Sequence, residues 1–320
     1  MDNIELIIQN GSTIYYPIVE EGITWETARK GVPGKLAFTV VKDGTLNFQE
    51  GNAVRLKVNG INVFYGFVFT KKRDKGNTID VVAYDQLRYL KNKDTYVYTN
   101  KTASDLVKMI AADFKLNIGT IENTPYIIAS RVEDNKTLFD MIQNALDLTL
   151  ENKKQMYVLY DDFGKLSLKN VESMKLDLLI DDETAEDYSY TSTIDNNTYN
   201  KIKLSYENEK TGKREIYIAQ DSNNMNNWGV LQLFETIQEK TNGKVKADTL
   251  LALYNKKTRN LSVKDAFGDV RVRGGSSVIV KLNLGDVDVQ NYMIVESVKH
   301  TFKNNEHLMN LTLRGGDFVA

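Results

Sequence analysis

Two histidines, His300 and His307, are the first residues to test for chemistry, because imidazole serves both as a metal ligand and as a general base. Their H-x6-H spacing differs from the i, i+4 pair with which a helix clamps zinc. Both also lie within stretches that are predicted to pair as strands. The spacing therefore predicts structural histidines and no metal site.

Paired carboxylates are the next candidates, because glycosidases need two opposed carboxyl groups of which one has a raised pKa. The pairs are Asp161 with Asp162, Asp181 with Asp182, and Asp286 with Asp288. Adjacent aspartates in polar turns usually face water. We therefore predict no catalytic residues and no enzyme, and keep a hydrolase that uses Asp161 and Asp181 as the alternative.

Two glycine-rich segments resemble catalytic or phosphate-binding loops only superficially. Gly274-Gly275-Ser276-Ser277 lacks the G-x-S-x-G elbow of a serine nucleophile, and a hairpin turn is expected there. Gly31-Val32-Pro33-Gly34-Lys35 lacks the spacing of a phosphate loop, and a strand is expected to follow it. Nucleotide binding is therefore not predicted, and no cofactor is expected.

Aromatic residues are numerous, with 17 tyrosines and 12 phenylalanines. Tyr15-Tyr16, Phe64-Tyr65 and Phe67 with Phe69 are of the type that stacks on sugar rings or fills a protein interface. Most are expected in the core. A carbohydrate-binding module remains a second alternative, which exposed aromatic side chains would support.

The composition limits the remaining classes of protein, metal site and partner. The chain has 320 residues, 42% of them hydrophobic, which predicts two or three folded units. It has no cysteine, so disulfides and thiolate metal sites are excluded. A net charge of −2 makes nucleic acid an unexpected partner. The acidic N-terminus and the lack of an apolar run of about 18 residues predict a protein made in the bacterial cytoplasm without a signal peptide, and no membrane insertion by itself.

The first 85 residues are predicted to form strands in a small barrel or sandwich. Asn59-Gly60 and Asp43-Gly44 can adopt the positive φ angles of two-residue hairpin turns. The segment Val63–Phe69 is apolar on both faces, and we expect one face to be covered by a neighbouring subunit. The strands are expected at residues 4–9, 13–19, 35–41, 54–58, 61–70 and 78–84.

An α+β insert is predicted between about residues 95 and 170. Its two amphipathic helices each begin with a threonine followed three positions later by an aspartate, Thr102 with Asp105 and Thr137 with Asp140. A hairpin over 157–168 follows. Residues 181–227 are polar, with strands expected at 201–206 and 215–218. Helices are expected at 231–239 and 247–256. The last expected strands are at 278–282, 293–302 and 308–313.

Several framework segments resemble the XkdQ/YqbQ family of baseplate hub proteins from contractile phage tails, PBSX-type defective prophages and phage-tail-like bacteriocins. They are Glu50–Leu56, Asn59-Gly60, Phe64–Val68 and Val81–Leu90 near one end, and Gly275, Met293–His300 and His307–Leu313 near the other. Both groups occur in order, so the resemblance covers nearly the whole chain.

The resemblance implies a β-rich α+β fold with two tail-tube-like β-barrel domains and α+β insert domains between them. We expect an N-terminal barrel over 1–95, an insert over 96–175, and a region over 176–320 that holds a second insert segment at about 176–205 and the C-terminal barrel. It also implies a homotrimer that contacts the tail tube protein, the central spike and baseplate wedge proteins within the assembled particle, with no hydrolase domain appended.

Overall fold

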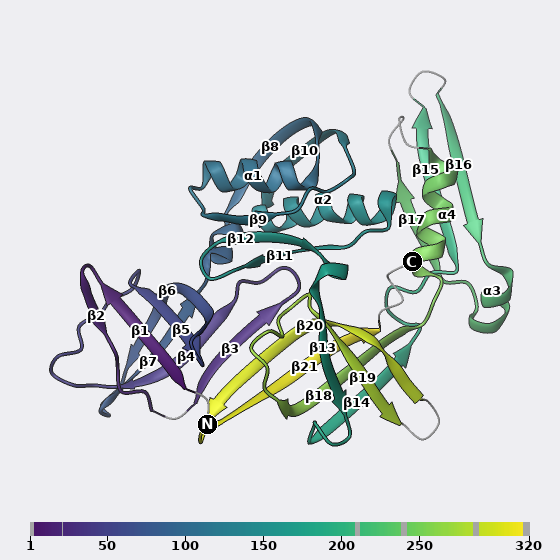
Figure 1. Ribbon diagram of the computed structural model, residues 1–320. Coiled ribbons are helices and arrows are strands. Elements are labelled where there is room, and N and C mark those ends of the chain that lie inside the picture. Colours follow the sequence, from purple (N-terminus) through teal and green to yellow (C-terminus); the bar gives the residue numbers. More distant parts are fainter. Residues whose placement is uncertain (1–2, 21, 209–211, 238–241, 284–287, 316–320) are drawn as a thin grey trace.

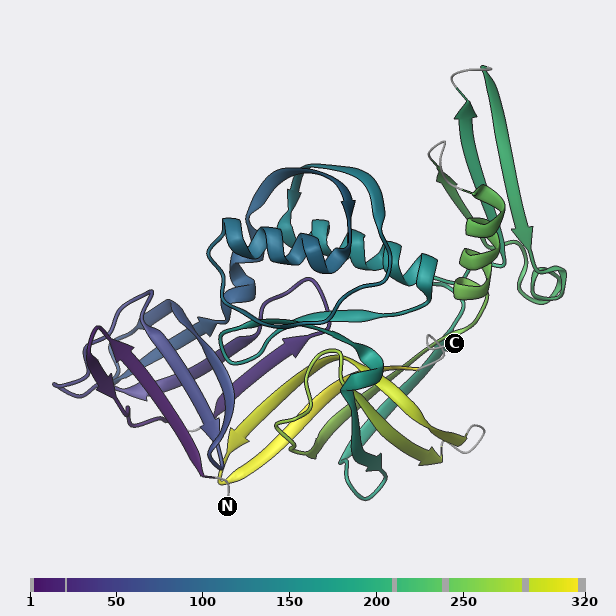
Figure 2. The ribbon, with the colours of Figure 1, turned by 45° about the horizontal axis from the view of Figure 1, so that its top comes forward.

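A computed structural model describes residues 3–20, 22–208, 212–237, 242–283 and 288–315 (Figure 1). Within these residues the fold is β-rich α+β. Most strands belong to one sheet, which runs through an N-terminal half and a C-terminal half. An insert of helices and short strands lies over the two halves, and a small unit projects beyond the insert (Figures 1 and 2).

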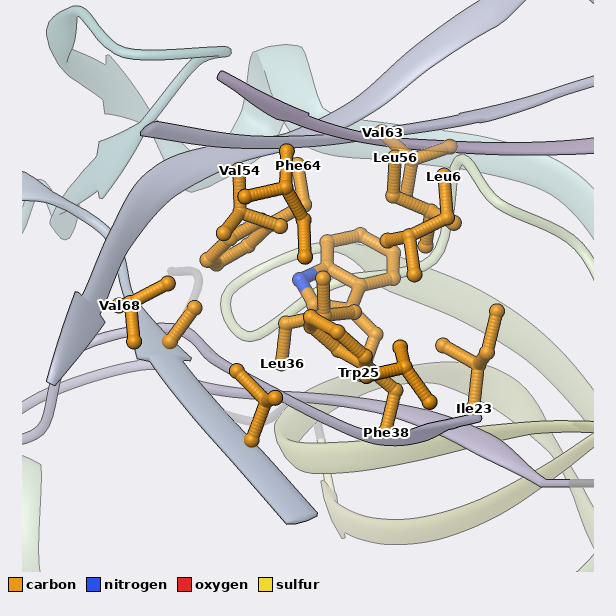
Figure 3. Close-up of a cluster of buried hydrophobic side chains, with 14 of the residues drawn as sticks. Leu6, Ile23, Trp25, Leu36, Phe38, Val54, Leu56, Val63, Phe64 and Val68 are labelled. Carbon is orange, nitrogen blue, oxygen red and sulfur yellow. The ribbon is translucent and has the colours of Figure 1, made fainter. Parts of the chain in front are cut away.

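The N-terminal half curls around its own apolar core. Its strands alternate buried and partly exposed residues, and the buried side chains of six strands meet in one cluster around Trp25 (Figure 3). The elements are β1 (Ile4–Asn10), β2 (Thr13–Tyr15), β3 (Ile23–Ala28), β4 (Lys35–Val41), β5 (Ala53–Val58), β6 (Ile61–Arg73), β7 (Thr78–Tyr84) and η1 (Gln86–Lys91).

The two predicted hairpin turns in this half have different outcomes. Asn59 and Gly60 have φ angles of 53° and 77° and join β5 to β6, which confirms that hairpin. The Asp43-Gly44 prediction is wrong, because β4 pairs with β3 and β7 whereas β5 pairs with β1 and β6. The Asp43 carboxylate instead accepts hydrogen bonds from the backbone N–H groups of Thr45 and Leu46, which stabilises a local turn.

Strand predictions in this half are otherwise close to the structure. β2 is shorter than the expected 13–19, although Val19 still forms a bridge with Val40 of β4. Strand β3 was not predicted, and its residues Ile23 and Trp25 point into the core. β3 is the strand that connects this half to the rest of the sheet, through β20.

The insert confirms the two predicted helices and the hairpin. Thr102 accepts from the Asp105 backbone N–H while the Asp105 carboxylate accepts from the Thr102 backbone N–H, and Thr137 caps the second helix through Asp140. Both helices bury one face in a shared core. The elements are β8 (Lys93–Lys101), α1 (Ala103–Asp113), β9 (Ile118–Ile121), β10 (Ile128–Thr137), α2 (Leu138–Lys153), β11 (Tyr157–Asp161), β12 (Leu166–Asn170) and η2 (Val171–Met174).

The C-terminal half shares its longest strand with the N-terminal half. Residues 288–294 of β20 pair with β19, whereas residues 297–302 pair with β3. The change of partner occurs at a bulge between Val295 and Ser297. The elements are β13 (Lys175–Asp181), β14 (Asp187–Thr193), β18 (Thr258–Phe267), β19 (Ser277–Asn283), β20 (Asp288–Lys303) and β21 (Glu306–Gly315).

Strands β13 and β14 occupy part of the region expected to be a second insert segment. They pair with β19 and β18 and bury side chains in the C-terminal core. The strand order in the described residues runs from β14 through β20 and β3 to β2, and the strand pairs in this part of the chain do not close either half into a barrel. The confirmed architecture is therefore a β-rich α+β fold built on one shared sheet.

The projecting unit is a three-stranded sheet with one helix packed on one face (Figure 2). The expected helix at 231–239 is wrong over its described residues, because β17 pairs in parallel with β15 and this pairing overrides helix propensity. Residues 238 and 239 lie outside the described part. The elements are β15 (Lys201–Asn208), β16 (Lys213–Gln220), α3 (Ser222–Trp228), β17 (Gln232–Thr236) and α4 (Gly243–Tyr254).

Candidate functional site

The two histidines meet inside the sheet. Nδ1 of His300 lies 2.9 Å from Nε2 of His307, and Nε2 of His300 lies 2.9 Å from the Val272 carbonyl oxygen. Because a carbonyl can only accept, Nε2 of His300 donates and its Nδ1 accepts from His307. The ring of His300 is fully buried and stacks on Trp25 at 4.6 Å. Burial, followed by the neighbouring His307, lowers the pKa of His300 to about 3, so the ring is neutral and structural.

The predicted carboxylate pairs do not form opposed dyads. Asp161 is buried whereas Asp162 is exposed. Asp181 caps a turn by accepting from the backbone N–H and the hydroxyl of Thr184, and Asp182 is exposed beside it. Asp286 lies outside the described residues, and so does the side chain of Asp288. In the described part of the chain, no three histidine, aspartate or glutamate side chains gather as a metal site.

The two glycine-rich segments are turns that precede strands. Gly34 donates its backbone N–H to Asp85 and is followed directly by β4, as predicted. Gly274 and Gly275 lie in a turn closed by the Ser276 N–H and the Arg273 carbonyl, 3.0 Å apart. This turn leads into β19 and does not connect two paired strands, so the hairpin prediction is wrong. Ser276 and Ser277 are both buried, which leaves no exposed nucleophile there.

A buried polar junction lies where the two halves and the insert meet. We define it by Asp85 of the N-terminal half, Asp161 of the insert, and Arg273 of the loop before β19. An Nη atom of Arg273 donates to the Asp161 backbone carbonyl at 2.9 Å. The guanidinium also lies over two rings, 4.4 Å from Tyr160 and 5.9 Å from Trp25. One arginine therefore contacts side chains from the insert and from the N-terminal core.

Glycine makes this close approach possible. A Cβ atom on Gly274 would lie 2.2 Å from the carbonyl carbon of Ala28, and one on Gly275 would lie 2.7 Å from Val158. The Gly274 N–H also donates to the Thr27 hydroxyl. Nearby, Glu296 at the β20 bulge pairs with Arg29 at 3.0 Å, and Arg29 is itself buried. The end of β3 is thus fixed by backbone contact and by an ion pair.

Two carboxyl groups share the junction and disfavour each other's charge. Asp85 accepts from the backbone N–H groups of Gly34 and Leu87, and Asp161 accepts from the Gly164 N–H. The second oxygen of Asp161 is buried and has no hydrogen-bond partner. Burial raises the pKa of Asp161 to about 6, and burial together with the Asp161 charge raises the pKa of Asp85 well above its ordinary range.

The raised pKa of Asp161 predicts a specific pH dependence of stability. The folded state binds this proton more tightly than the unfolded chain, whose aspartates titrate near 3.8. The contribution of this proton to the free energy of unfolding is fully present below about pH 4 and is lost as the pH rises through 6. In Asp161→Asn we expect the part of this fall that comes from Asp161, on the order of 2 to 3 kcal/mol, to be lost.

Urea unfolding at a series of pH values between 4 and 7.5 measures this effect. Asp162→Asn is the matched control, because Asp162 is the exposed neighbour in the same turn. Its stability should follow that of the unmodified chain at each pH. Equal pH profiles for Asp161→Asn and Asp162→Asn would show that Asp161 is not a source of the pH dependence.

The outer face of β6 is partly covered by other elements of this chain. Tyr65 lies 5.7 Å from Phe163 at the tip of the insert hairpin, and Phe67 and Phe69 lie 6.5 and 6.1 Å from Tyr89 of η1. Part of this cover comes from the insert and from η1, and the three rings remain half-buried, so cover by a neighbouring subunit stays a prediction. These rings are therefore not presented as an open sugar-binding platform.

Residues 23–314 match the model of the YQBQ-like family. The chain belongs to this YqbQ-like family. Two relatives from Bacillus subtilis (strain 168) are each 30% identical, namely YqbQ over 319 residues and the phage-like element PBSX protein XkdQ over 318 residues. Each alignment covers 96% of this chain, and 95% and 96% of the respective relative.

A solved structure shares the fold of this YqbQ-like chain. The 43 kDa tail protein of prophage MuSo2 from Shewanella oneidensis superimposes with a TM-score of 0.72 and 13% sequence identity. The match covers 99% of this chain and 100% of that protein. The arrangement of the shared sheet, insert and projecting unit is thus a known phage tail protein fold.

The YqbQ-like chain presents several candidate contact surfaces. Ile14, Tyr16 and Ile18 are 49%, 67% and 64% exposed on and after β2. The open face of the projecting sheet carries exposed Ile218 and Phe234, which flank Lys203 on adjacent strands. None of the helices in the described part of the chain combines the length and apolar character that crossing a bilayer requires.

A hollow of about 710 Å³ crosses the outer face of the shared sheet at the join between the halves. Its charged lining residues are four lysines and one glutamate, and Lys35 lies 3.6 Å from Glu26. The other three are Lys91, Lys264 and Lys299. This basic surface and the apolar patches are the open features of the molecule, whereas the buried junction is a structural centre.

Proposed function

We propose that this chain is the structural baseplate hub of a contractile phage tail or a tail-like bacteriocin. In this role it joins the tail tube to the central spike as a homotrimer. The supporting observations are membership of the family that includes the PBSX protein XkdQ and the fold shared with a prophage tail protein. In this proposal the function of the chain is spread over its surfaces.

The observation that carries the proposal is the sharing of β20 by two curled halves of one sheet. We propose that the halves are the two tail-tube-like units, so that three copies offer six such units to a hexameric tube. The insert and the projecting unit then face the spike and the baseplate wedge proteins. The expected division at residues 95 and 175 belongs to this proposal.

The proposed role is mechanical and requires no reaction. A tail-associated hydrolase is disfavoured because Asp161 is buried in the junction, whereas Asp181 caps a turn in the C-terminal half. A carbohydrate-binding role on β6 is disfavoured because the insert and η1 partly cover its aromatic row. The chain is proposed to be made in the bacterial cytoplasm and then built into the particle.

Quantitative mass spectrometry of purified contractile particles tests this function. The expected result is about three copies of this chain per particle, equal to the number of spike chains. Six or more copies would point to a tube or wedge component. Absence from particles, with the chain present in the lysate, would overturn the structural role and favour a soluble lytic enzyme or an assembly factor.

A further inference from the structure

One exposed patch combines apolar and basic residues on the N-terminal half. Its apolar part is Ile14, Tyr16 and Ile18. The Ile18 carbonyl accepts from the Val41 N–H, and the next residue, Lys42, donates its backbone N–H to Asn77 in the turn between β6 and β7. The segment Lys71-Lys72-Arg73-Asp74-Lys75 includes the start of that turn and holds four basic residues and one acidic residue. Among these, the Lys71 amino group lies 4.2 Å from the centre of the Phe48 ring, and Lys72 lies 3.8 Å from Asp80. We call residues 14–18, 42 and 71–75 the basic patch.

A second patch combines apolar and acidic residues on the C-terminal half. Phe267 at the end of β18 is 67% exposed, and Leu179 of β13 is 42% exposed. The Phe267 backbone N–H donates to the Thr184 carbonyl in the turn between β13 and β14. Residues 181–187 of this turn hold five carboxylates and no basic residue. We call residues 179, 181–187 and 267 the acidic patch.

The two patches complement each other but belong to different ends of the sheet. The strand order begins at β14, beside the acidic patch, and finishes at β2, beside the basic patch. Figure 1 places these two strands in opposite halves. Exposed large apolar side chains beside charges that are opposite in sign on the two surfaces are the composition of a protein interface. A second copy of this chain offers the matching surface to each end.

We propose that the basic patch of one copy docks on the acidic patch of the next copy. This contact is head-to-tail, since different surfaces meet, and a head-to-tail contact closes into a ring when its rotation allows. The inference rests on the proposed homotrimer and assigns its interface. The apolar residues contribute the area that is buried in the contact, and the charges fix the relative orientation of the two copies. Because salt screens charges, assembly is expected to be weaker at high salt.

Site-directed cross-linking tests the contact directly, because the chain has no cysteine of its own. Asn77→Cys and Ser189→Cys place thiols beside the two patches at exposed positions without removing a charge or an apolar anchor. With a short bismaleimide, the double variant should give dimer and trimer bands. Each single variant should stay monomeric on the gel, because a head-to-tail contact brings two different residues together.

Two cross-linking outcomes would overturn the contact. Dimers from a single variant would show that like surfaces meet. Absence of cross-links in the double variant, in a sample whose mass in solution is that of a trimer, would place the interface elsewhere while leaving the trimer intact.

Charge reversal provides an independent test by light scattering at low salt. Reversing the basic side (K72E, R73E and K75E) or the acidic side (D182K, E183K and E186K) should reduce the trimer fraction at least tenfold. Both reversals in one chain should restore it, because the complementarity is then restored. A trimer that survives either single-sided reversal overturns the contact, and copy number in particles still decides the hub role separately.

Discussion

Replacing Arg273 with alanine is expected to lower the free energy of unfolding by about 3 kcal/mol at pH 7.5. The substitution removes the hydrogen bond to the buried Asp161 carbonyl and the contact with the Tyr160 ring. It also removes the positive charge that favours the ionised forms of Asp85 and Asp161. Because these carboxyl groups are protonated at lower pH, the loss should be smaller at pH 5.

Urea unfolding of Arg273→Ala and Arg271→Ala measures this effect. Arg271 is the matched control, since it lies two residues away in the same loop and pairs with Asp269 at an exposed position. Its replacement should cost about 0.5 kcal/mol. Equal losses for the two variants, or a loss from Arg273→Ala that does not change between pH 5 and 7.5, would contradict the role given to the junction.

Replacing Gly274 with alanine should have a comparable effect through sterics alone. The added Cβ would lie 2.2 Å from the Ala28 carbonyl carbon and 2.4 Å from the Arg29 nitrogen. These are backbone atoms, so no side-chain rotation relieves the overlap, and β3 must move away from the loop. We expect a loss of about 3 kcal/mol or more, at the upper end of overpacking effects.

Gly44→Ala is the control for this substitution, because a Cβ there meets nothing within 4 Å. Thermal unfolding should leave Gly44→Ala within a few degrees of the unmodified chain and shift Gly274→Ala downward by more than 5 °C. If Gly274→Ala does not fold at all, its soluble yield against Gly44→Ala gives the same ranking. Equal stability of the two variants would show that the approach at Gly274 is not tight.

Local features of the fold could be predicted from the sequence. The Asn59-Gly60 turn and the threonine caps at Thr102 and Thr137 depend on residues close in the chain, and the structure has each of them. The helix predicted at 231–239 failed because the partner of β17 is β15, about 30 residues earlier in the chain. The helix and strand propensities of residues 231–239 contain no information about that partner strand.

The junction could not be predicted for the same reason. Asp85, Asp161 and Arg273 are separated by about 75 and 110 residues, and none has a distinctive spacing. Asp85 alone had a local signal, since an aspartate before Gln86–Lys91 is a typical N-cap. Trp25 was missed because β3 is a short strand with polar residues on its outer face. Which surfaces stay exposed depends on which strands lie at the edges of the sheet. The edge strands are known only from the complete topology.

The sharing of β20 also limits how such genes can recombine. Met293 and Val295 of this strand belong to the C-terminal core, whereas Phe302 belongs to the N-terminal core. An exchange of either half between related genes would leave one core with a strand from a foreign parent. A one-residue deletion at the bulge would turn one group of side chains to the wrong face of the sheet. The two halves are therefore expected to be inherited as a single unit, whereas the projecting unit can be exchanged without altering either core.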